Sequence, residues 1–171
     1  MTELKELMLR TPRLTLAVAE SLTCGHVQAR IGAISGASEF FLGGLTAYSL
    51  DEKVRHLGVE RAAAKRVNCV SAEIAEQMAR GVCALFGADV GVATTGYAER
   101  SPADRVTEPF AWWAVAHRRR PFGKRRTGGG KFFVRRGRVE CPGASRTEVQ
   151  AIVAAAAVAE LVEYLRELRG A

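Results

Sequence analysis

Apolar and polar positions alternate over several short stretches of the chain. In residues 14–20, Leu14, Leu16 and Val18 alternate with small residues, which predicts a strand covered on both faces. Further strands are predicted at residues 39–49, 88–96 and 109–119, and the end of a hairpin at residues 131–142. The Gly43-Gly44 pair inside the second of these strands indicates a bulge or a close backbone approach.

Helical spacing of apolar residues separates and follows these strands. Predicted helices begin near Cys24, at Asp51 and after Ser71, cover residues 60–66, and close the chain after the capping box Ser145–Glu148. Gly58 and Gly87 are placed to end two of them. The expected apolar stripes are Ile74, Met78, Val82 and Leu85 on one helix, and Val149, Ile152, Val153, Ala156, Leu161, Tyr164, Leu165 and Leu168 on the last. This order predicts an α/β sandwich formed as a single domain over residues 1–171.

The composition is that of a soluble globular domain, with 48% hydrophobic and 25% charged residues. No apolar run approaches the roughly 20 residues that span a membrane. The N-terminus carries acids and lacks the apolar core of a secretory signal, so we expect a cytoplasmic protein without membrane contact. Four separated cysteines and three histidines form no zinc pattern, so we expect reduced cysteines, a core position for Cys83, no metal and no cofactor.

The net charge of +7 comes from one segment. Residues 118–138 contain ten Lys or Arg and no acid, whereas the rest of the chain has 15 basic and 18 acidic residues. Such a segment can bind nucleic acid by releasing counterions from phosphates. The alternative is a solvated β-hairpin or loop whose charges only maintain solubility.

Hydroxyl groups gather at the ends of three predicted strands, in "AESLTCG", "TAYSLDEK" and "ATTGYAER". Ligands of open α/β sheets bind where strands end and helices begin. Thr23, Cys24 and Gly25 precede a helix whose N-terminus can hold an anion. Ser21 lies beside them, either as a nucleophile or as a simple helix cap.

A serine nucleophile needs a base, and the three histidines show no triad spacing with an acid. Lys53 is the candidate base, because burial can lower the pKa of an amine toward neutrality. Tyr48 can relay a proton or orient this lysine. The alternative is a solvated lysine and a tyrosine of the core.

Four segments together resemble one known family. They are "AESLTCG", "GASEFFLGGLTAYSLDEKVRHLGV", "VSAEIAEQMARGV" and "ATTGYA". They resemble the CinA C-terminal domain family, the competence/damage-inducible protein A group, whose characterised members are nicotinamide-nucleotide amidohydrolases (NMN deamidases). The resemblance covers roughly residues 14–165, and its second motif, from Gly36 to Val59, is highly specific.

The resemblance implies a three-layer α/β/α domain, often a homodimer, that hydrolyses the amide of nicotinamide mononucleotide (NMN) to nicotinate mononucleotide and ammonia. It implies Ser21 as nucleophile and Lys53 as base, with Tyr48 assisting. It also implies substrate contacts by residues of the third strand end and the last helix, which are Thr94, Thr95, Gly96 and Arg146.

Several positions depart from the family pattern. Leu22, Cys24 and Leu50 replace a cysteine, a glycine and an asparagine, Glu99 and Arg100 replace a Gly-Pro turn, and Ala144 and Ser145 replace a glycine and an acid. Two hypotheses follow. The domain is an amidohydrolase with a shifted nucleotide-like substrate, or it is an inactive CinA-like domain that binds a nucleotide, a nucleic acid or a protein partner.

Overall fold

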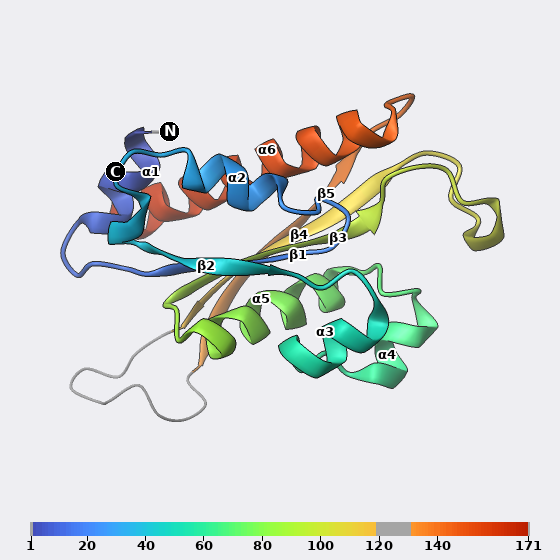
Figure 1. Cartoon of the computed structure of the whole chain (residues 1–171), viewed down its shortest axis with the longest axis horizontal. Coiled ribbons are helices and arrows are strands. Elements are labelled where there is room, and N and C mark those ends of the chain that lie inside the picture. The colour runs from blue at the N-terminus through green and yellow to red at the C-terminus, as the bar shows by residue number, and fades with distance from the viewer. Residues whose placement is uncertain (1, 119–130, 171) are drawn as a thin grey trace.

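A five-stranded mixed sheet forms the centre of the computed structural model, which describes residues 2–118 and 131–170 (Figure 1). The strand order is β2-β1-β3-β4-β5. The first three of these strands are parallel, and β4 and β5 each run antiparallel to the strand before them. The bounds are β1 Leu16–Glu20, β2 Phe41–Thr46, β3 Val90–Tyr97, β4 Phe110–Arg118 and β5 Phe132–Glu140.

Helices cover both faces of the sheet, which confirms the expected α/β/α architecture (Figure 1). One face carries α1 Thr2–Leu9, α2 His26–Gly32 and α6 Arg146–Arg169, and the other carries α3 Leu50–Leu57, α4 Arg61–Arg66 and α5 Ala72–Phe86. The short 3₁₀ turns η1 Ala37–Glu39 and η2 Pro102–Asp104 lie in connections.

Strand β1 lies inside the sheet, between β2 and β3, and is buried along its whole length. Leu16 and Val18 enter the core on the α2 and α6 side, whereas Ala17 and Ala19 enter the core beneath α5. Burying one large aliphatic side chain contributes about 1.5–3 kcal/mol. The alternation in the sequence therefore gives the correct strand and the correct pair of covered faces.

The bulge expected at the glycine pair is present in β2. The pairing register with β1 shifts by one residue between Phe41 and Gly43, which leaves Leu42 as the extra residue. Gly43 has a φ of 134°, a conformation that L side chains rarely adopt. A Cβ on Gly44 would lie 2.5 Å from the side chain of Gln28, so this glycine lets α2 approach the strand.

The expected helix ends are confirmed. The Ser71 hydroxyl accepts from the Ile74 N–H at the start of α5, and Gly58 and Gly87 end α3 and α5 in the left-handed conformation. At the start of α6, the Glu148 carboxylate accepts from both the N–H and the hydroxyl of Ser145.

Two expectations about apolar faces are wrong, and one helix is not predicted. Leu85 is 49% exposed because α3 already ends beside Gly81, one turn earlier on α5. Ile152 and Leu168 of α6 are also exposed, and small residues of that helix face the core instead. The unpredicted helix is α1, whose residues Leu4, Leu7 and Met8 show helical spacing and are buried.

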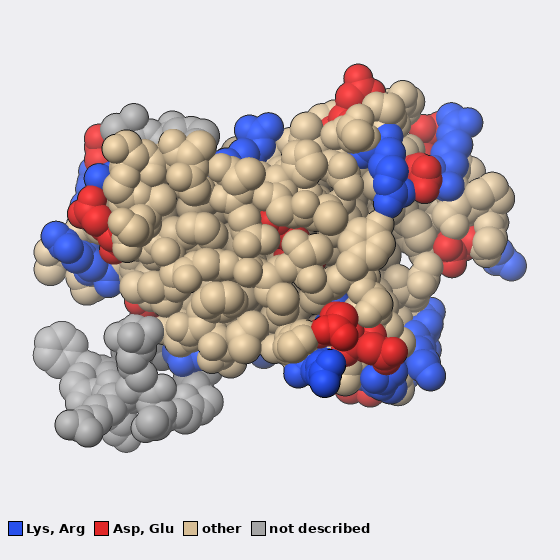
Figure 2. All heavy atoms as spheres, in the orientation of Figure 1, with Lys and Arg blue, Asp and Glu red and all other residues tan. Residues whose placement is uncertain are grey.

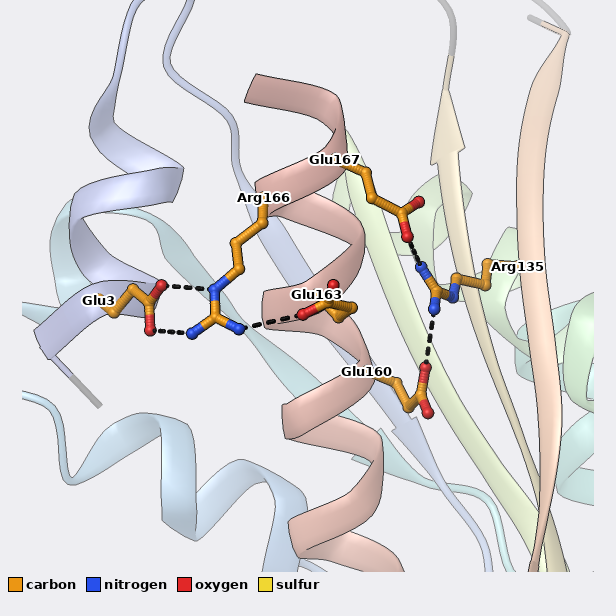
Figure 3. Close-up of polar contacts among 6 residues, drawn as sticks. All are labelled: Glu3, Arg135, Glu160, Glu163, Arg166 and Glu167. Carbon is orange, nitrogen blue, oxygen red and sulfur yellow. Dashed lines mark hydrogen bonds and ion pairs between the residues drawn. The ribbon is translucent and has the colours of Figure 1, made fainter. Parts of the chain in front are cut away.

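Ion pairs join the last helix to α1 and to strand β5 of the sheet (Figure 3). Arg166 bonds both carboxylate oxygens of Glu3 on α1, at 2.7 and 2.8 Å, and also bonds Glu163. Hydrogen bonding to Arg166 lowers the pKa of Glu3. Arg135 of β5 lies between Glu160 and Glu167 of the same helix. The helix is thus attached to α1 on one side and to the sheet on the other.

Charged side chains lie mainly toward the ends of the molecule in the view of Figure 2, and the centre of this face carries few of them. The edge strand β2 crosses this face, and its Leu42 is 41% exposed. An uncharged sheet edge is a surface to which another chain can pair. Within residues 2–118 and 131–170, no helix is long and apolar enough to cross a bilayer.

Candidate active site

The ends of strands β1 and β2 bring a serine and a lysine together. Ser21 follows β1, and Lys53 lies in the second turn of α3, which follows β2. The Nζ of Lys53 lies 3.0 Å from the Oγ of Ser21, 2.9 Å from the carbonyl oxygen of Ala47 and 2.8 Å from that of Tyr48. The lysine therefore has three oxygen neighbours and one of them is the candidate nucleophile.

Which of these three contacts Lys53 donates depends on whether its amine is protonated. Both carbonyl oxygens only accept, so each takes one N–H of Lys53. A charged ammonium has a third N–H for Ser21. A neutral amine has none left, so its lone pair faces the Ser21 hydroxyl and can accept its proton. The three contacts thus fit a charged ammonium that donates to Ser21 and also a neutral amine that accepts from it.

Burial favours the neutral form. Lys53 is 1% exposed and Ser21 is 8% exposed. Removal from water lowers the pKa of Lys53, an effect that the nearby Cys69 thiol opposes in smaller part.

Local structure holds both side chains in place. Ser49 caps α3 by accepting from the N–H of Glu52, and this fixes the turn that carries Lys53. The Ser21 N–H donates to the carbonyl of Thr94 on the neighbouring strand β3.

A pocket of about 400 Å³ opens in front of the pair. We call it the inner pocket. Its lining includes six residues that the sequence analysis selected, namely Ser21, Tyr48, Lys53, Thr95, Gly96 and Arg146. It also includes Asn68, Cys69, Glu99 and Arg100. Residues from five separate segments therefore face one hollow at the carboxyl ends of the parallel strands.

Thr23, Cys24 and Gly25 do not line this pocket, and the expected anion cradle at the start of α2 is wrong. The carboxylate of Glu20 already occupies that helix end, where it accepts from the N–H groups of Gly25, Val27 and Gln28. Glu20 is fully buried, so no external anion is needed there.

Thr94 also lies outside the lining of the inner pocket. Its hydroxyl is buried against the hydroxyl of Thr23, at 2.7 Å. These two threonines join β3 to the turn after β1, which is a structural contact.

Tyr48 contributes to the site in a different way from the one expected. Its backbone carbonyl accepts from Lys53, whereas its phenol is bonded to Arg146 and the residue is 52% exposed. Arg146 also pairs with Glu99 at 2.7 Å. The phenol therefore positions Arg146, and the backbone positions the lysine.

The sequence analysis missed the loop before α5. Asn68 and Cys69 have positive φ angles of 46° and 62°, and the Cys69 carbonyl accepts from the Thr95 hydroxyl at 2.8 Å. The side-chain amide of Asn68 donates to the phenol of Tyr97. Asparagine is one of the few residues that adopt this conformation readily, so an Asn between two helices was the available signal.

The basic segment is partly neutralised in the structure. The arginines of β5 pair with carboxylates of the helices and of their own strand: Arg135 with Glu160 and Glu167, Arg136 with Glu73 and Glu76, and Arg138 with Glu140. Residues 119–130 lie outside the described residues. Binding of nucleic acid by residues 118–138 therefore stays a prediction.

The fold and the inner pocket define a class: a three-layer α/β/α domain with a buried serine–lysine pair at the strand ends. The family described as the CinA C-terminal domain matches residues 1–165. The chain therefore belongs to this family.

Curated relatives and solved structures agree with this assignment. A CinA-like protein of Chlorobium limicola is 44% identical over 91 residues, which is 53% of this chain and 21% of the relative. A CinA-like protein of Picosynechococcus is 45% identical over 91 residues, which is 53% of this chain and 22% of that relative. The matched part thus spans about a fifth of the length of these relatives.

Similar solved structures cover nearly the whole chain. A CinA superfamily protein from Enterobacter cloacae has a TM-score of 0.81 at 27% identity, over 96% of this chain and 89% of that one. A competence damage-inducible protein A from Klebsiella pneumoniae has a TM-score of 0.79 at 26% identity, over 96% and 93% of the two chains.

Proposed function

We propose that this domain is an amidohydrolase that uses Ser21 as nucleophile and Lys53 as base on a nicotinamide-nucleotide-like substrate. The observation that carries the proposal is the 3.0 Å contact between a buried amine and a serine hydroxyl that opens on a pocket. A hydroxyl is a weak nucleophile until a neighbouring base removes its proton.

The proposed reaction has two stages. In the first, Lys53 takes the proton of Ser21 while Oγ attacks the carboxamide carbon, and the same proton then leaves with the amide nitrogen as ammonia. In the second, Lys53 takes a proton from water, the hydroxide attacks the ester, and Ser21 recovers its proton as the carboxylic acid departs. NMN would give nicotinate mononucleotide and ammonia, with Thr95, Gly96 and Arg146 as substrate contacts.

Ammonia release from NMN tests the proposal. We expect the wild-type protein to release ammonia and Ser21→Ala to lose roughly 10⁶-fold in rate, the scale on which removal of a serine nucleophile lowers kcat. Ser35→Ala, an exposed serine in the loop after α2, is the matched control and should keep the wild-type rate. Equal rates for wild type and Ser21→Ala would contradict the assignment of the nucleophile.

One observation favours the second candidate, an inactive binding domain. Arg146 is paired with the carboxylate of Glu99, so its guanidinium is engaged within the chain. A domain of this kind would bind NMN without releasing ammonia, and the same assay combined with calorimetric titration separates the two candidates.

A further inference from the structure

A second cavity, of about 490 Å³, adjoins the inner pocket. We call it the outer cavity. Asn68, Val70 and Tyr97 line both hollows, so they form a shared wall between them. The two hollows are therefore neighbours on the surface, and one extended ligand lying over this wall would contact both.

The outer cavity is lined by four cations and one acid. The cations are Lys65, Arg66, Arg105 and Arg138, and the acid is Asp104. They come from the end of α4, the connection between β3 and β4, and β5, which are far apart in the sequence and meet at one end of the sheet (Figure 1). The local charge is therefore strongly positive.

Three of these cations are available to a ligand. Within residues 2–118 and 131–170, the side chains of Lys65, Arg66 and Arg105 form no hydrogen bond or ion pair. Asp104 accepts from the hydroxyl of Ser101 at 2.6 Å, so part of its capacity is already used. Elsewhere on the described surface most arginines are paired with carboxylates.

Flat surfaces complete the cavity. The guanidinium of Arg138 lies 3.8 Å from the ring centre of Phe110, whose ring lies 5.6 Å from that of Tyr97. A guanidinium stacked on an aromatic ring offers a planar face as well as donors, and such surfaces accept planar rings and phosphate groups.

We propose that the outer cavity binds a phosphate group and the planar ring attached to it, both belonging to a ligand whose other end reaches Ser21. This inference rests on the proposed function for the inner end. The volume exceeds what a single phosphate fills, and the free Lys and Arg side chains match the two negative charges of a pyrophosphate group. The substrate class is then a nicotinamide dinucleotide, in which a second phosphate and a base extend beyond the mononucleotide.

Calorimetric titration tests this inference by measuring the Kd of NMN and of nicotinamide adenine dinucleotide (NAD). The Ser21→Ala variant is used, because the substitution prevents turnover of the ligand. We expect NAD to bind about tenfold more tightly than NMN, because its second phosphate and its base reach the outer cavity and one hydrogen bond to a charged group is worth that much. Lys65→Gln/Arg66→Gln should remove the advantage of NAD and leave NMN binding unchanged within about twofold. The control Arg10→Gln/Arg13→Gln, which lowers the net charge equally at exposed sites before β1, should change neither.

The outcomes are distinguishable. The inference is overturned if NAD binds no more tightly than NMN, or if the cavity variant and the control behave alike. Titration with inorganic pyrophosphate, followed by NMR of the residues around α4, should show the same loss in the cavity variant. If pyrophosphate and NAD bind as expected while the wild type releases no ammonia from either nucleotide, the proposed hydrolysis fails and the phosphate site stands.

Discussion

At the scale of single residues, the account depends on Lys53 and Ser21. Thirty-two positions separate them, yet the amine reaches the hydroxyl at 3.0 Å in a dry environment. The sequence predicts this meeting because both residues follow parallel strands that lie side by side, and the family resemblance selects the same two residues. The sequence also predicts an anion site at the start of α2, which the structure does not support, because spacing alone cannot show that Glu20 turns its own carboxylate onto that helix end.

The residue Glu99 should control how strongly Arg146 binds an anionic ligand. We expect Glu99→Gln to lower the Kd for NMN by about 2–5-fold, the scale of an exposed ion pair that no longer competes. Glu167→Gln, which also removes a carboxylate from an arginine, is a control remote from the pocket. Calorimetric titration measures the effect, and an unchanged or higher Kd for Glu99→Gln would show that the ligand does not use Arg146.

At the scale of elements, the strands and the helix ends follow from the sequence. Period-two alternation gives β1, and capping residues give the starts of α5 and α6. The tertiary neighbours of a helix do not follow from its own spacing, so Leu85 and Ile152 are exposed despite their apolar character. The loop at Asn68 and Cys69 was missed because its strained conformation has no periodic signature.

The stability of helix α2 should depend on the buried Glu20 carboxylate, which accepts hydrogen bonds from the N–H groups at the start of the helix. Glu20→Gln replaces one acceptor oxygen by an amide that cannot accept, which leaves backbone N–H groups of α2 unsatisfied. We expect a loss of about 2 kcal/mol in the free energy of unfolding. In a domain of this size this lowers the Tm by roughly 4–8 °C.

Calorimetry on Glu20→Gln and on Glu6→Gln, an exposed glutamate of α1, gives the comparison. The control should keep the wild-type Tm within about 1 °C. A Tm for Glu20→Gln equal to that of the control would mean that the carboxylate does not stabilise the helix.

At the scale of the whole molecule, the sequence gives the three-layer order and the net charge but not the distribution of ion pairs. Arg135 and Arg136 of β5 find their partners on α6 and α5, more than 20 positions away, and only the folded sheet brings these elements together. The outer cavity is a similar case, because its cations come from three separate segments.

The stability of the whole domain should change with pH through Lys53. Its pKa is lowered in the folded state by burial, so above that pKa the folded protein has lost a proton that the unfolded chain keeps until about pH 10.4. In this window the free energy of unfolding rises with pH, by up to about 1.4 kcal/mol per unit from this group. Below the folded pKa both states hold the proton and the contribution is constant.

Urea unfolding of wild type and Lys53→Met between pH 7 and pH 10 isolates this contribution, since other groups titrate in both proteins. The difference in unfolding free energy, wild type minus variant, should increase with pH. A constant difference would show that Lys53 has the same pKa folded and unfolded.

The most direct measurement of the central claim is the pKa of Lys53 itself, by NMR of protein labelled with ¹³C at the lysine Cε. The chain has five lysines, so the Lys53 signal is identified as the one missing in Lys53→Met. The account predicts that this signal titrates below the ordinary lysine value of about 10.4. A Lys53 signal that titrates at or above that value would contradict a neutral amine beside Ser21, and with it the proposed nucleophile and base.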